Sequence, residues 1–504
     1  MKLREILQGV SYQVLSGDVD VDVKDLAYDS RQVQEGFLFV ALAGAVTDGH
    51  AYISQALKAG AKALVVEHEV DHKALGIREG FPVVMAQDGR TALSLMAANF
   101  YDHPASKMKM IGITGTKGKT TTAFMVRDII EKAGFSCGLI GTVGTFFKGK
   151  KIPSEHTTPE SYDLQKILAD MVAEGCEYLV MEVSSQAYKL KRVAGIHYHV
   201  GVFTNITPDH IGPGEHEDFA EYLTCKKELL KNCDVALVNR DDEHWAEIIE
   251  GATCKIYSFG KSEEADLKIG KVAHQEEDGT LSMVFETEGR YEGKVVVGLP
   301  GRFNVKNATA ALGVSQLLDL VEEPVLQALK DVKVAGRVEP VPGTRGYTVL
   351  IDYAHNGVST ESVLTTLMEY NPGRLVAIFG CGGNRSKLRR YEMGEVVGAL
   401  ADFAIVTADN PRKEAFQDIV KDIEVGLKKA EKGKGSCEYV VIEDRGEAVE
   451  YGVRHAKKGD IIVLLGKGHE DYQEIQGVRY PYSDKAAVLN ALKKVNEGNE
   501  INEE

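Results

Sequence analysis

Residues 110–120 read MIGITGTKGKT, an apolar run that leads through a glycine-containing loop to a lysine and a threonine. The segment MIGITG at 110–115 predicts a buried strand, and KTTTAFMVRDIIEKAG at 119–134 predicts the helix that follows it. Glycines between a strand and a helix let main-chain N–H groups turn toward an anion. Strand–helix turns of this composition also occur without a ligand. The stretch therefore predicts a parallel α/β sheet and, as a hypothesis, a phosphate-binding loop.

Two side chains at the end of this loop suit nucleotide chemistry. Lys119 can reach β and γ phosphates, and the hydroxyl of Thr120 can bind Mg²⁺. The usual spacing has a glycine where this chain has Ile113, so Gly115 and Gly118 must supply the turn. The sequence therefore predicts a variant of the phosphate-binding loop.

Two further polar residues follow apolar strands of the same segment. Glu182 ends the run YLVME, where a carboxylate is placed to bind Mg²⁺ directly or through water; a solvated glutamate at a strand end is the alternative. His210 follows the run VGVFT in the motif NITPDH. A lone histidine is more often structural than a ligand, so the residues alone leave both roles open for His210.

Three α/β segments follow one another along the chain. Short strands and helices alternate over residues 1–105, and the phosphate-loop segment occupies 106–335 with a β-rich appendage at 253–300. A third segment, 336–504, repeats the pattern of apolar strands separated by helices. We therefore predict an α/β protein of three domains: an N-terminal α/β domain, a central P-loop ATPase-like parallel sheet with its appendage, and a C-terminal Rossmann-like domain.

The composition excludes several classes of protein. Of 504 residues, 44% are hydrophobic and 27% charged, which is typical of globular domains rather than fibrous or disordered chains. No apolar run approaches the length of about 18 residues that a membrane helix needs, so we expect no membrane insertion. A net charge of −16 disfavours non-specific binding of nucleic acid. Seven cysteines without a CxxC pair favour reduced thiols and a cytoplasmic location.

Three polar loops follow strands of the third segment. They are the arginine-rich stretch 380–390, the tetrapeptide DNPR at 409–412, and GKGHED at 466–471. Arginine binds carboxylates and phosphates through two parallel hydrogen bonds. Ligands of doubly wound sheets bind beyond the C-terminal ends of the strands, so we expect the three loops to form one crevice. Taken singly, each loop could be an ordinary turn.

Eight motifs in a fixed order resemble those of the Mur ligases, and the resemblance covers essentially the whole chain. The motifs are TGTKGKTTT at 114–122, HTTPES at 156–161, EVSSQA at 182–187, NITPDH at 205–210, GRFNVKNA at 301–308, AGRVEPV at 335–341, DYAHN at 352–356 and DNPR at 409–412, together with the triplet Asp29-Ser30-Arg31. The resemblance implies an ATP-dependent amide ligase of peptidoglycan precursor synthesis whose N-terminal domain binds UDP. It implies that ATP phosphorylates the terminal carboxylate of UDP-MurNAc-L-Ala-D-Glu, and that an amine of meso-diaminopimelate attacks the acyl phosphate.

The resemblance also assigns a nucleotide and metal site. The ATP-binding residues that it implies are Thr114, Gly115, Thr116, Lys117, Gly118, Lys119, Thr120, Asn304, Arg337 and Asp352. Thr120 and Glu182 are implied ligands of one Mg²⁺, and His210 and Lys226 of a second. Lys226, in YLTCKKELL, matches a family lysine that CO₂ converts to a carbamate; the neighbouring Lys227 keeps an ordinary helix lysine as the alternative. Lys119, Lys226 and His210 are thus the expected catalytic residues.

The substrate contacts are assigned in the same way. Those implied for UDP-MurNAc-dipeptide are Ser30, Thr157, Thr158, Ser184 and Arg192. Those implied for the amino acid are Arg390, Asp409, Asn410, Pro411, Arg412, Gly466 and Glu470. The two arginines suit the distal carboxylate of diaminopimelate, and Glu470 suits its distal ammonium. Leu190 and the segment IGPGEH at 211–216 depart from the family pattern, so the roles of Glu215 and His216 stay open.

Other functions remain as alternatives. L-Lysine is the alternative amino acid, because Lys413-Glu-Ala-Phe follows DNPR where diaminopimelate enzymes often have an acidic-proline continuation. Another Mur ligase or a folylpolyglutamate synthetase is the rival enzyme, although the synthetase family lacks an N-terminal domain with Asp29-Ser30-Arg31. A nucleotide-switched binding protein is the rival from another class, and the arginine-rich loop of the third segment disfavours it. We expect a monomer.

Overall fold

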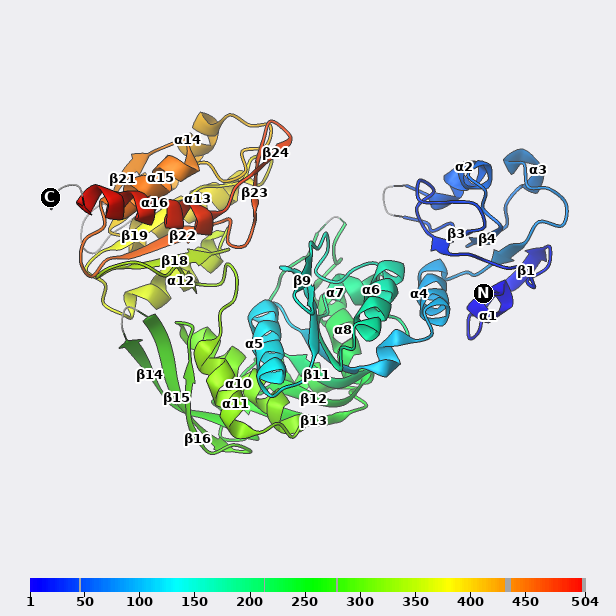
Figure 1. Ribbon diagram of the computed structural model, residues 1–504, viewed down its shortest axis with the longest axis horizontal. Coiled ribbons are helices and arrows are strands. Elements are labelled where there is room, and N and C mark those ends of the chain that lie inside the picture. The colour runs from blue at the N-terminus through cyan, green and yellow to red at the C-terminus, as the bar shows by residue number, and fades with distance from the viewer. Residues whose placement is uncertain (45–46, 213, 278–279, 431–436, 501–504) are drawn as a thin grey trace. The chain divides into compact units, whose positions relative to one another are not determined.

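A computed structural model describes residues 1–44, 47–212, 214–277, 280–430 and 437–500, and Figure 1 labels many of its elements. The chain divides into two compact units, Met1–Lys268 with Thr309–Val325 and Ile269–Ala308 with Leu326–Glu504. Strands and helices alternate in both units, and the described strands form three large sheets and one separate hairpin. The strands of each large sheet lie within one of the three predicted segments, whose boundaries near 105 and 335 stay predictions.

The N-terminal sheet has the strand order β1-β5-β4-β3-β2, and it is parallel except for β1. Its elements are α1 (Leu3–Ile6), β1 (Gln13–Ser16), β2 (Leu26–Ala27), β3 (Leu38–Val40), the 3-10 helix η1 (Gly49–Tyr52), α2 (Ile53–Lys58), β4 (Ala63–Val66), α3 (His72–Leu75), β5 (Val83–Met85) and α4 (Gly89–Phe100). Successive side chains of a strand point to opposite faces, so Leu38 and Val40 pack in one core and Phe39 in the other. Both faces of the sheet are therefore buried.

The central sheet carries the phosphate loop. Its elements are η2 (Pro104–Lys107), β6 (Lys109–Thr114), α5 (Lys119–Lys132), β7 (Cys137–Gly141), β8 (Gly144–Phe147), β9 (Lys150–Ile152), α6 (Ser161–Ala173), β10 (Tyr178–Glu182), α7 (Ser185–Lys189), β11 (Tyr198–Phe203), α8 (Phe219–Lys227), η3 (Glu228–Lys231), β12 (Cys233–Asn239), α9 (Trp245–Ile249), β13 (Lys255–Gly260), β14 (Leu267–Glu277), β15 (Thr280–Gly289), β16 (Gly293–Val297), α10 (Arg302–Leu317) and α11 (Glu322–Asp331). The order is β16-β15-β14-β13-β12-β11-β6-β10-β7-β8-β9. The strands from β12 to β7 are parallel, as predicted, and β13, which the sequence analysis placed in the appendage, also pairs parallel with β12. Strands β8 and β9 add an antiparallel edge that was not predicted.

The C-terminal sheet has the order β17-β18-β22-β19-β20-β21, and it is parallel except for β17. Its elements are β17 (Glu339–Pro340), β18 (Thr348–Asp352), α12 (Gly357–Met368), β19 (Leu375–Phe379), α13 (Lys387–Leu400), β20 (Phe403–Val406), α14 (Phe416–Lys429), β21 (Glu438–Val441), α15 (Arg445–Arg454), β22 (Ile461–Leu465), the hairpin β23 (Tyr472–Ile475) and β24 (Val478–Pro481), and α16 (Asp484–Glu500). Leu350 and Val463 face one core while Val349 and Ile462 face the other, which confirms the doubly wound arrangement.

Two expectations from composition can be compared with the structure. Among the described helices, none is long and apolar enough to cross a membrane. All seven cysteines are free thiols.

Candidate active site

The loop between β6 and α5 has the geometry of a phosphate-binding loop. Gly115 and Gly118 have φ angles of 141° and 85°, which L side chains rarely adopt. A Cβ atom added to Gly115 would lie 2.0 Å from Thr204 Oγ1, so only glycine fits where the loop passes that hydroxyl. Helix α5 begins at Lys119, immediately after the turn. The two glycines named from the sequence therefore do supply the turn that Ile113 cannot.

The oxygen atoms around Glu182 suit Mg²⁺. The Thr120 hydroxyl donates to Glu182 Oε2 at 2.9 Å, and the carboxylate is 1% exposed. Thr142, a residue that the sequence analysis missed, donates its N–H to Glu182 Oε1 at 2.9 Å and its hydroxyl to Oε2 at 3.3 Å. A hydroxyl and a carboxylate at one helix N-terminus are ligands that Mg²⁺ prefers, so the predicted pair fits this ion.

Two lysines meet at the main chain of the loop. Lys119 Nζ donates to the carbonyls of Gly115 and Thr116 at 2.8 and 3.0 Å, and Lys226 Nζ donates to Gly115 at 2.9 Å. Lys226 is 2% exposed, so it is not the ordinary surface lysine that its neighbour Lys227 suggested as an alternative. Burial, followed by the nearby Lys119 charge, lowers the pKa of Lys226 well below its ordinary value.

Tyr222 connects Lys226 to the loop, and the sequence analysis missed it. Its hydroxyl lies 3.1 Å from Thr116 Oγ1, and Lys226 Nζ lies 4.6 Å from its ring centroid. Burial raises the pKa of Tyr222 to about 12. A usable signal was present, because residues four apart share one face of a helix and Tyr222 precedes Lys226 by four. The ring of His210 lies 6.4 Å from that of Tyr222, so the structure brings His210 to the same place.

The predicted muramoyl-dipeptide contacts gather beside Glu182. The Thr158 hydroxyl donates to the carbonyl of Glu182 at 2.9 Å and accepts the N–H of Ser184 at 3.1 Å. Arg192 donates to the carbonyl of Thr158 at 3.1 Å, and Thr157 Oγ1 lies 3.0 Å from Thr142 Oγ1. Four of the five predicted residues thus form one cluster next to the expected Mg²⁺ ligands.

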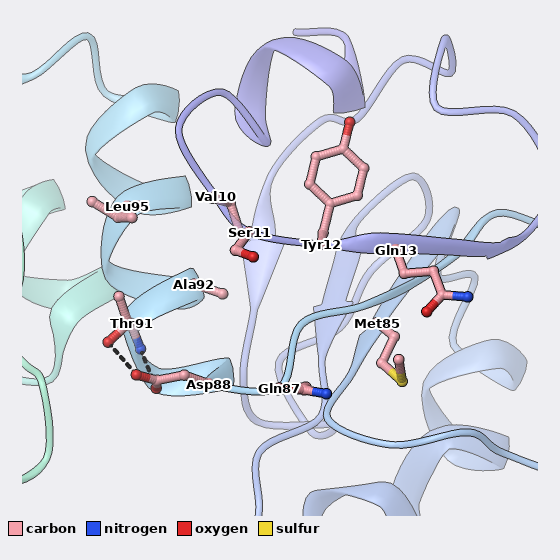
Figure 2. A pocket seen from close by; sticks show the side chains of 10 residues that line it. All are labelled: Val10, Ser11, Tyr12, Gln13, Met85, Gln87, Asp88, Thr91, Ala92 and Leu95. Atoms are coloured by element: carbon pink, nitrogen blue, oxygen red, sulfur yellow. Dashed lines mark hydrogen bonds between the residues drawn. The ribbon is translucent and has the colours of Figure 1, made fainter.

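The fifth, Ser30, lies in the turn that follows β2 of the N-terminal sheet, where its hydroxyl donates to Gln55 Oε1 at 3.3 Å. A cavity of about 440 Å³ in that sheet is lined by Tyr12, Gln13, Met85 and Asp88, among others (Figure 2). Ser30 does not occur among the described residues that line it. This cavity is therefore separate from the position predicted for UDP.

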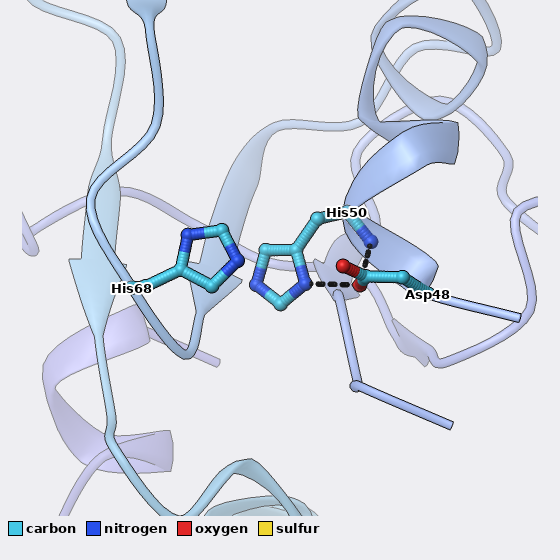
Figure 3. Close-up of side chains that lie close together, drawn as sticks. All are labelled: Asp48, His50 and His68. Carbon is cyan, nitrogen blue, oxygen red and sulfur yellow. Dashed lines mark hydrogen bonds and ion pairs between the residues drawn. The ribbon is translucent and has the colours of Figure 1, made fainter. Parts of the chain in front are cut away.

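A trio of Asp48, His50 and His68, beside the same sheet in and around η1 and after β4, has the residue types of a metal site (Figure 3). His50 Nδ1 lies 2.6 Å from Asp48 Oδ1, and His50 Nε2 accepts the N–H of Glu67 at 2.9 Å. Both ring nitrogens of His50 are thus occupied by protein groups. His50 therefore connects η1 to the residue that follows β4. In this arrangement it offers no lone pair to a cation.

The other residues predicted to bind the nucleotide lie in the second unit. Asn304 is buried and its side chain bonds to the Pro300 carbonyl and to Asn307. Asp352 accepts the N–H groups of Val338 and Ala354, both at 2.8 Å. Burial raises the pKa of Asp352, and the charge of Arg337 opposes that rise. The structure thus brings Arg337 near Asp352, while their contacts with the nucleotide stay predictions.

The DNPR and GKGHED loops meet around a buried lysine. Lys467 is 0% exposed, and its Nζ reaches Asn410 Oδ1 at 3.1 Å, Glu470 Oε2 at 3.0 Å and Asp409 Oδ1 at 3.5 Å. Asn410 also donates to Glu470 at 2.9 Å. Gly466 lies beside the Asp409 carboxylate, since an added Cβ would be 3.6 Å from it. Lys467 was not among the residues predicted from the sequence, because its burial depends on the contact between the two loops.

The arginine-rich loop contacts the DNPR loop. A Cβ atom added to Gly383 would lie 1.8 Å from the carbonyl of Pro411. The arginine-rich loop therefore approaches the DNPR loop so closely that only glycine fits at position 383. Arg412 donates to the Gly383 carbonyl at 2.7 Å and lies 3.6 Å from Glu474, at the edge of β23.

Arg390 occupies a different environment. It is 1% exposed, and its terminal nitrogens engage Asp422 at 3.0 Å and Glu414 at 2.5 Å. Its guanidinium ties α13 to α14 in this structure, so its predicted contact with the amino acid stays a prediction.

The loop after β6 has the geometry of a phosphate-binding loop, and the buried carboxylate of Glu182 lies at the end of the neighbouring strand β10. These features define the class of P-loop nucleotide-binding proteins. The chain also matches the families described as "Mur ligase family, catalytic domain" at residues 22–101, "Mur ligase middle domain" at 113–315 and "Mur ligase, glutamate ligase domain" at 336–468.

Individual relatives agree with these matches. The chain is 39% identical to UDP-N-acetylmuramoyl-L-alanyl-D-glutamate--2,6-diaminopimelate ligase of Caldanaerobacter subterraneus subsp. tengcongensis, over 98% of this chain and 99% of that protein. It is 35% identical to the ligase of the same name from Clostridium perfringens, over 98% and 100%. A solved structure of a ligase of that name superposes with a TM-score of 0.71 at 27% identity, covering 98% of this chain and 99% of that one. The chain therefore belongs to the Mur ligase family, and the predicted three-domain α/β fold class is confirmed.

Proposed function

We propose that this protein is the ATP-dependent ligase that joins the terminal carboxylate of UDP-MurNAc-L-Ala-D-Glu to an amine of meso-diaminopimelate, in peptidoglycan precursor biosynthesis. The observation that carries the proposal is the similarity to diaminopimelate ligases along 98% of the chain. A carboxylate is a poor electrophile, so ATP first converts it to an acyl phosphate. The amine attacks that carbonyl carbon, phosphate leaves, and ADP is released.

The first unit supplies the activation step. Lys119 and the N–H groups of residues 114–120 bind the phosphates of ATP and offset their negative charge. Thr120 and Glu182 hold the Mg²⁺ ion, which when bound supplies further stabilisation of phosphate charge. Thr157, Thr158, Ser184 and Arg192 orient the dipeptide beside this site, while Ser30 contacts the uridine end.

Lys226 is the residue that we propose carries CO₂ as an N6-carboxylate. Its nitrogen forms a bond to the carbon of CO₂ and loses one proton to solvent. Only the neutral amine is nucleophilic, and the burial that lowers the pKa of Lys226 favours that form. The product is a carboxylate, an oxygen ligand that suits a second Mg²⁺ together with His210.

The second unit supplies the nucleotide contacts of Asn304, Arg337 and Asp352 and selects the incoming amino acid. Arg412 binds the distal carboxylate of diaminopimelate, because a guanidinium pairs with a carboxylate through two hydrogen bonds. Glu470, with Asp409, faces the distal ammonium. Asn410, Pro411 and Gly466 set the shape of the loops that hold them.

The test is to follow ADP release from the purified protein. ADP must appear only when UDP-MurNAc-L-Ala-D-Glu and an amino acid are both present, and kcat/KM must favour meso-diaminopimelate over L-lysine. A preference for lysine would keep the ligase and refute the assigned amino acid. Release of ADP without the dipeptide would instead favour the nucleotide-switched binding protein. The cytoplasmic location and the monomeric state belong to this proposal and stay predictions.

A further inference from the structure

The segment after β11 is a closed loop pinned to the core by a buried histidine. His216 donates its N–H to the carbonyl of His210 at 3.0 Å, and Gly212 donates to the carbonyl of His216 at 3.0 Å. The His216 side chain is 0% exposed, and its Nε2 lies 2.8 Å from Ser185 Oγ. Its ring also packs edge-on against Tyr222, with 5.3 Å between centroids. Residue 213 of this segment lies outside the described residues.

A carboxylate of the same loop selects which ring nitrogen of His210 carries the hydrogen. His210 Nδ1 lies 2.9 Å from Glu215 Oε1. An ionised carboxylate only accepts hydrogen bonds, so Nδ1 must carry the proton. In the neutral ring, Nε2 then keeps the lone pair that can bind a metal ion. His210 has a φ of 55°, an uncommon conformation for a residue with a side chain, and the bonds to His216 hold it there.

We propose that Glu215 and His216 are positioning residues for His210, with Glu215 selecting the ring form whose Nε2 binds the second metal ion and His216 anchoring the loop. This inference rests on the proposed function, in which His210 and Lys226 bind that ion. Histidines that bind metals almost always donate their other N–H to a carboxylate, a carbonyl or water. The roles that the sequence left open for these two residues are thereby assigned.

The experiment begins with the metal-free protein carrying ¹⁵N-labelled histidine, in which His210→Ala identifies the His210 signals by NMR. Wild type is expected to show His210 protonated at Nδ1. Glu215→Ala should lose this preference, whereas Glu215→Gln should keep much of it because its amide oxygen still accepts. Glu217→Ala, at an exposed position two residues further on, is the matched control and should leave the signal unchanged.

The second readout is the concentration of Mn²⁺ that gives half-maximal ligation. It should rise about 10- to 100-fold in Glu215→Ala, with kcat restored at excess Mn²⁺. His216→Phe keeps a ring against Tyr222 while removing the bond to Ser185, and it should shift the Mn²⁺ requirement in the same direction without loss of folding.

The outcomes distinguish a failure of the positioning role of Glu215 and His216 from a failure of the proposed ligase function. If His210→Ala raises the Mn²⁺ requirement but Glu215→Ala changes neither that requirement nor the ring protonation, the positioning role is overturned and the proposed ligase stands. If His210→Ala itself leaves the Mn²⁺ requirement unchanged, the assignment of His210 as a ligand fails, and the inference fails with it.

Discussion

One buried lysine lies on α8 beside the phosphate loop, and another lies where the DNPR and GKGHED loops of the C-terminal sheet meet, but the surroundings of the two differ. Lys226 Nζ donates to the main-chain carbonyl of Gly115, and burial lowers its pKa well below the ordinary value. Lys467 Nζ lies within 3.5 Å of two carboxylates, those of Asp409 and Glu470, and within 3.1 Å of the Asn410 amide oxygen. One lysine lies where a cation is poorly compensated, and the other lies where carboxylates surround it.

The difference fits two kinds of chemistry. A site that disfavours a buried cation keeps an amine reactive, which is what attack on CO₂ requires. The site around Lys467 balances its own charges. Such a site can recognise a zwitterionic amino acid by the positions of its charged groups rather than by its net charge. The two lysines also differ in what their removal should do, because breaking a buried ion pair leaves charge behind, whereas removing a poorly compensated amine does not.

The largest effect on stability is expected from Lys467→Met. The substitution leaves the carboxylates of Asp409 and Glu470 buried without their cation, and such a loss typically costs about 3–5 kcal/mol. Urea denaturation measures the change. Lys485→Met, which removes the partner of Glu339 from a half-exposed position, is the control and should cost about 1 kcal/mol or less. Equal losses in the two variants would show that the Lys467 cluster is not a compensated buried site.

Lys119→Ala should abolish ligation while the fold stays intact. One charge-stabilising contact in such a site is typically worth about 3–4 kcal/mol in the transition state, or roughly 100- to 1,000-fold in kcat. Steady-state kinetics beside a thermal melt give both quantities, with the exposed Lys166→Ala as control. Activity within a few-fold of wild type would remove Lys119 from the phosphate site.

Lys226→Ala should lose activity on the order of 100-fold, because it removes a metal ligand. Added bicarbonate should not restore it, since no amine is left to react, whereas Lys226→Glu should recover a small part by restoring a carboxylate on a shorter arm. Ligation assays over a range of bicarbonate concentrations make the comparison. Full activity of the Ala variant would mean that a buried structural lysine has been assigned to the metal site.

Arg412→Ala is expected to change selectivity. Losing a hydrogen bond to a charged group costs about 1.5–3 kcal/mol. The activation free energy for diaminopimelate should rise by roughly that amount relative to that for L-lysine, so kcat/KM for diaminopimelate should fall by the corresponding factor. Arg454→Ala, half-exposed and paired with Glu450 on α15, is the control. A variant that retains its full preference for diaminopimelate would move the recognition of the distal carboxylate to another residue.

Most of the fold could be predicted because its strands are continuous apolar runs. The stretch 110–115 and the run ending at Glu182 are buried on both faces, and such runs are typical of covered parallel sheets. The antiparallel strands β8 and β9 were missed: β8 is only the short run GTFF, and β9 is KKI, exposed throughout. β9 pairs antiparallel with β8 although no buried face marks it in the sequence.

The site was predictable where a residue type carries its own chemistry, and less so where tertiary packing decides its role. Glu182 and Lys119 were named from the residues alone. Arg390 has the residue type of an anion contact, yet it pairs with Asp422 on α14 and with Glu414 just before that helix, and only the folded chain brings these carboxylates to it. Thr142 acts through Glu182, which is distant in sequence, so no local pattern marked it, whereas Tyr222 carried the signal of its four-residue spacing from Lys226.

The most direct test of the contrast between the two lysines is the pH dependence of the stability of Lys226→Met, measured against wild type without nucleotide or bicarbonate. The folded-state pKa of Lys226 is lowered from its ordinary value of 10.5, so the unfolded chain binds more protons between the two values. Wild-type stability attributable to this group therefore rises with pH across that window. We predict that Lys226→Met is the more stable protein at pH 7 and that its advantage shrinks as the pH approaches 10. A variant less stable than wild type at pH 7, or a difference that does not change with pH, would contradict the account.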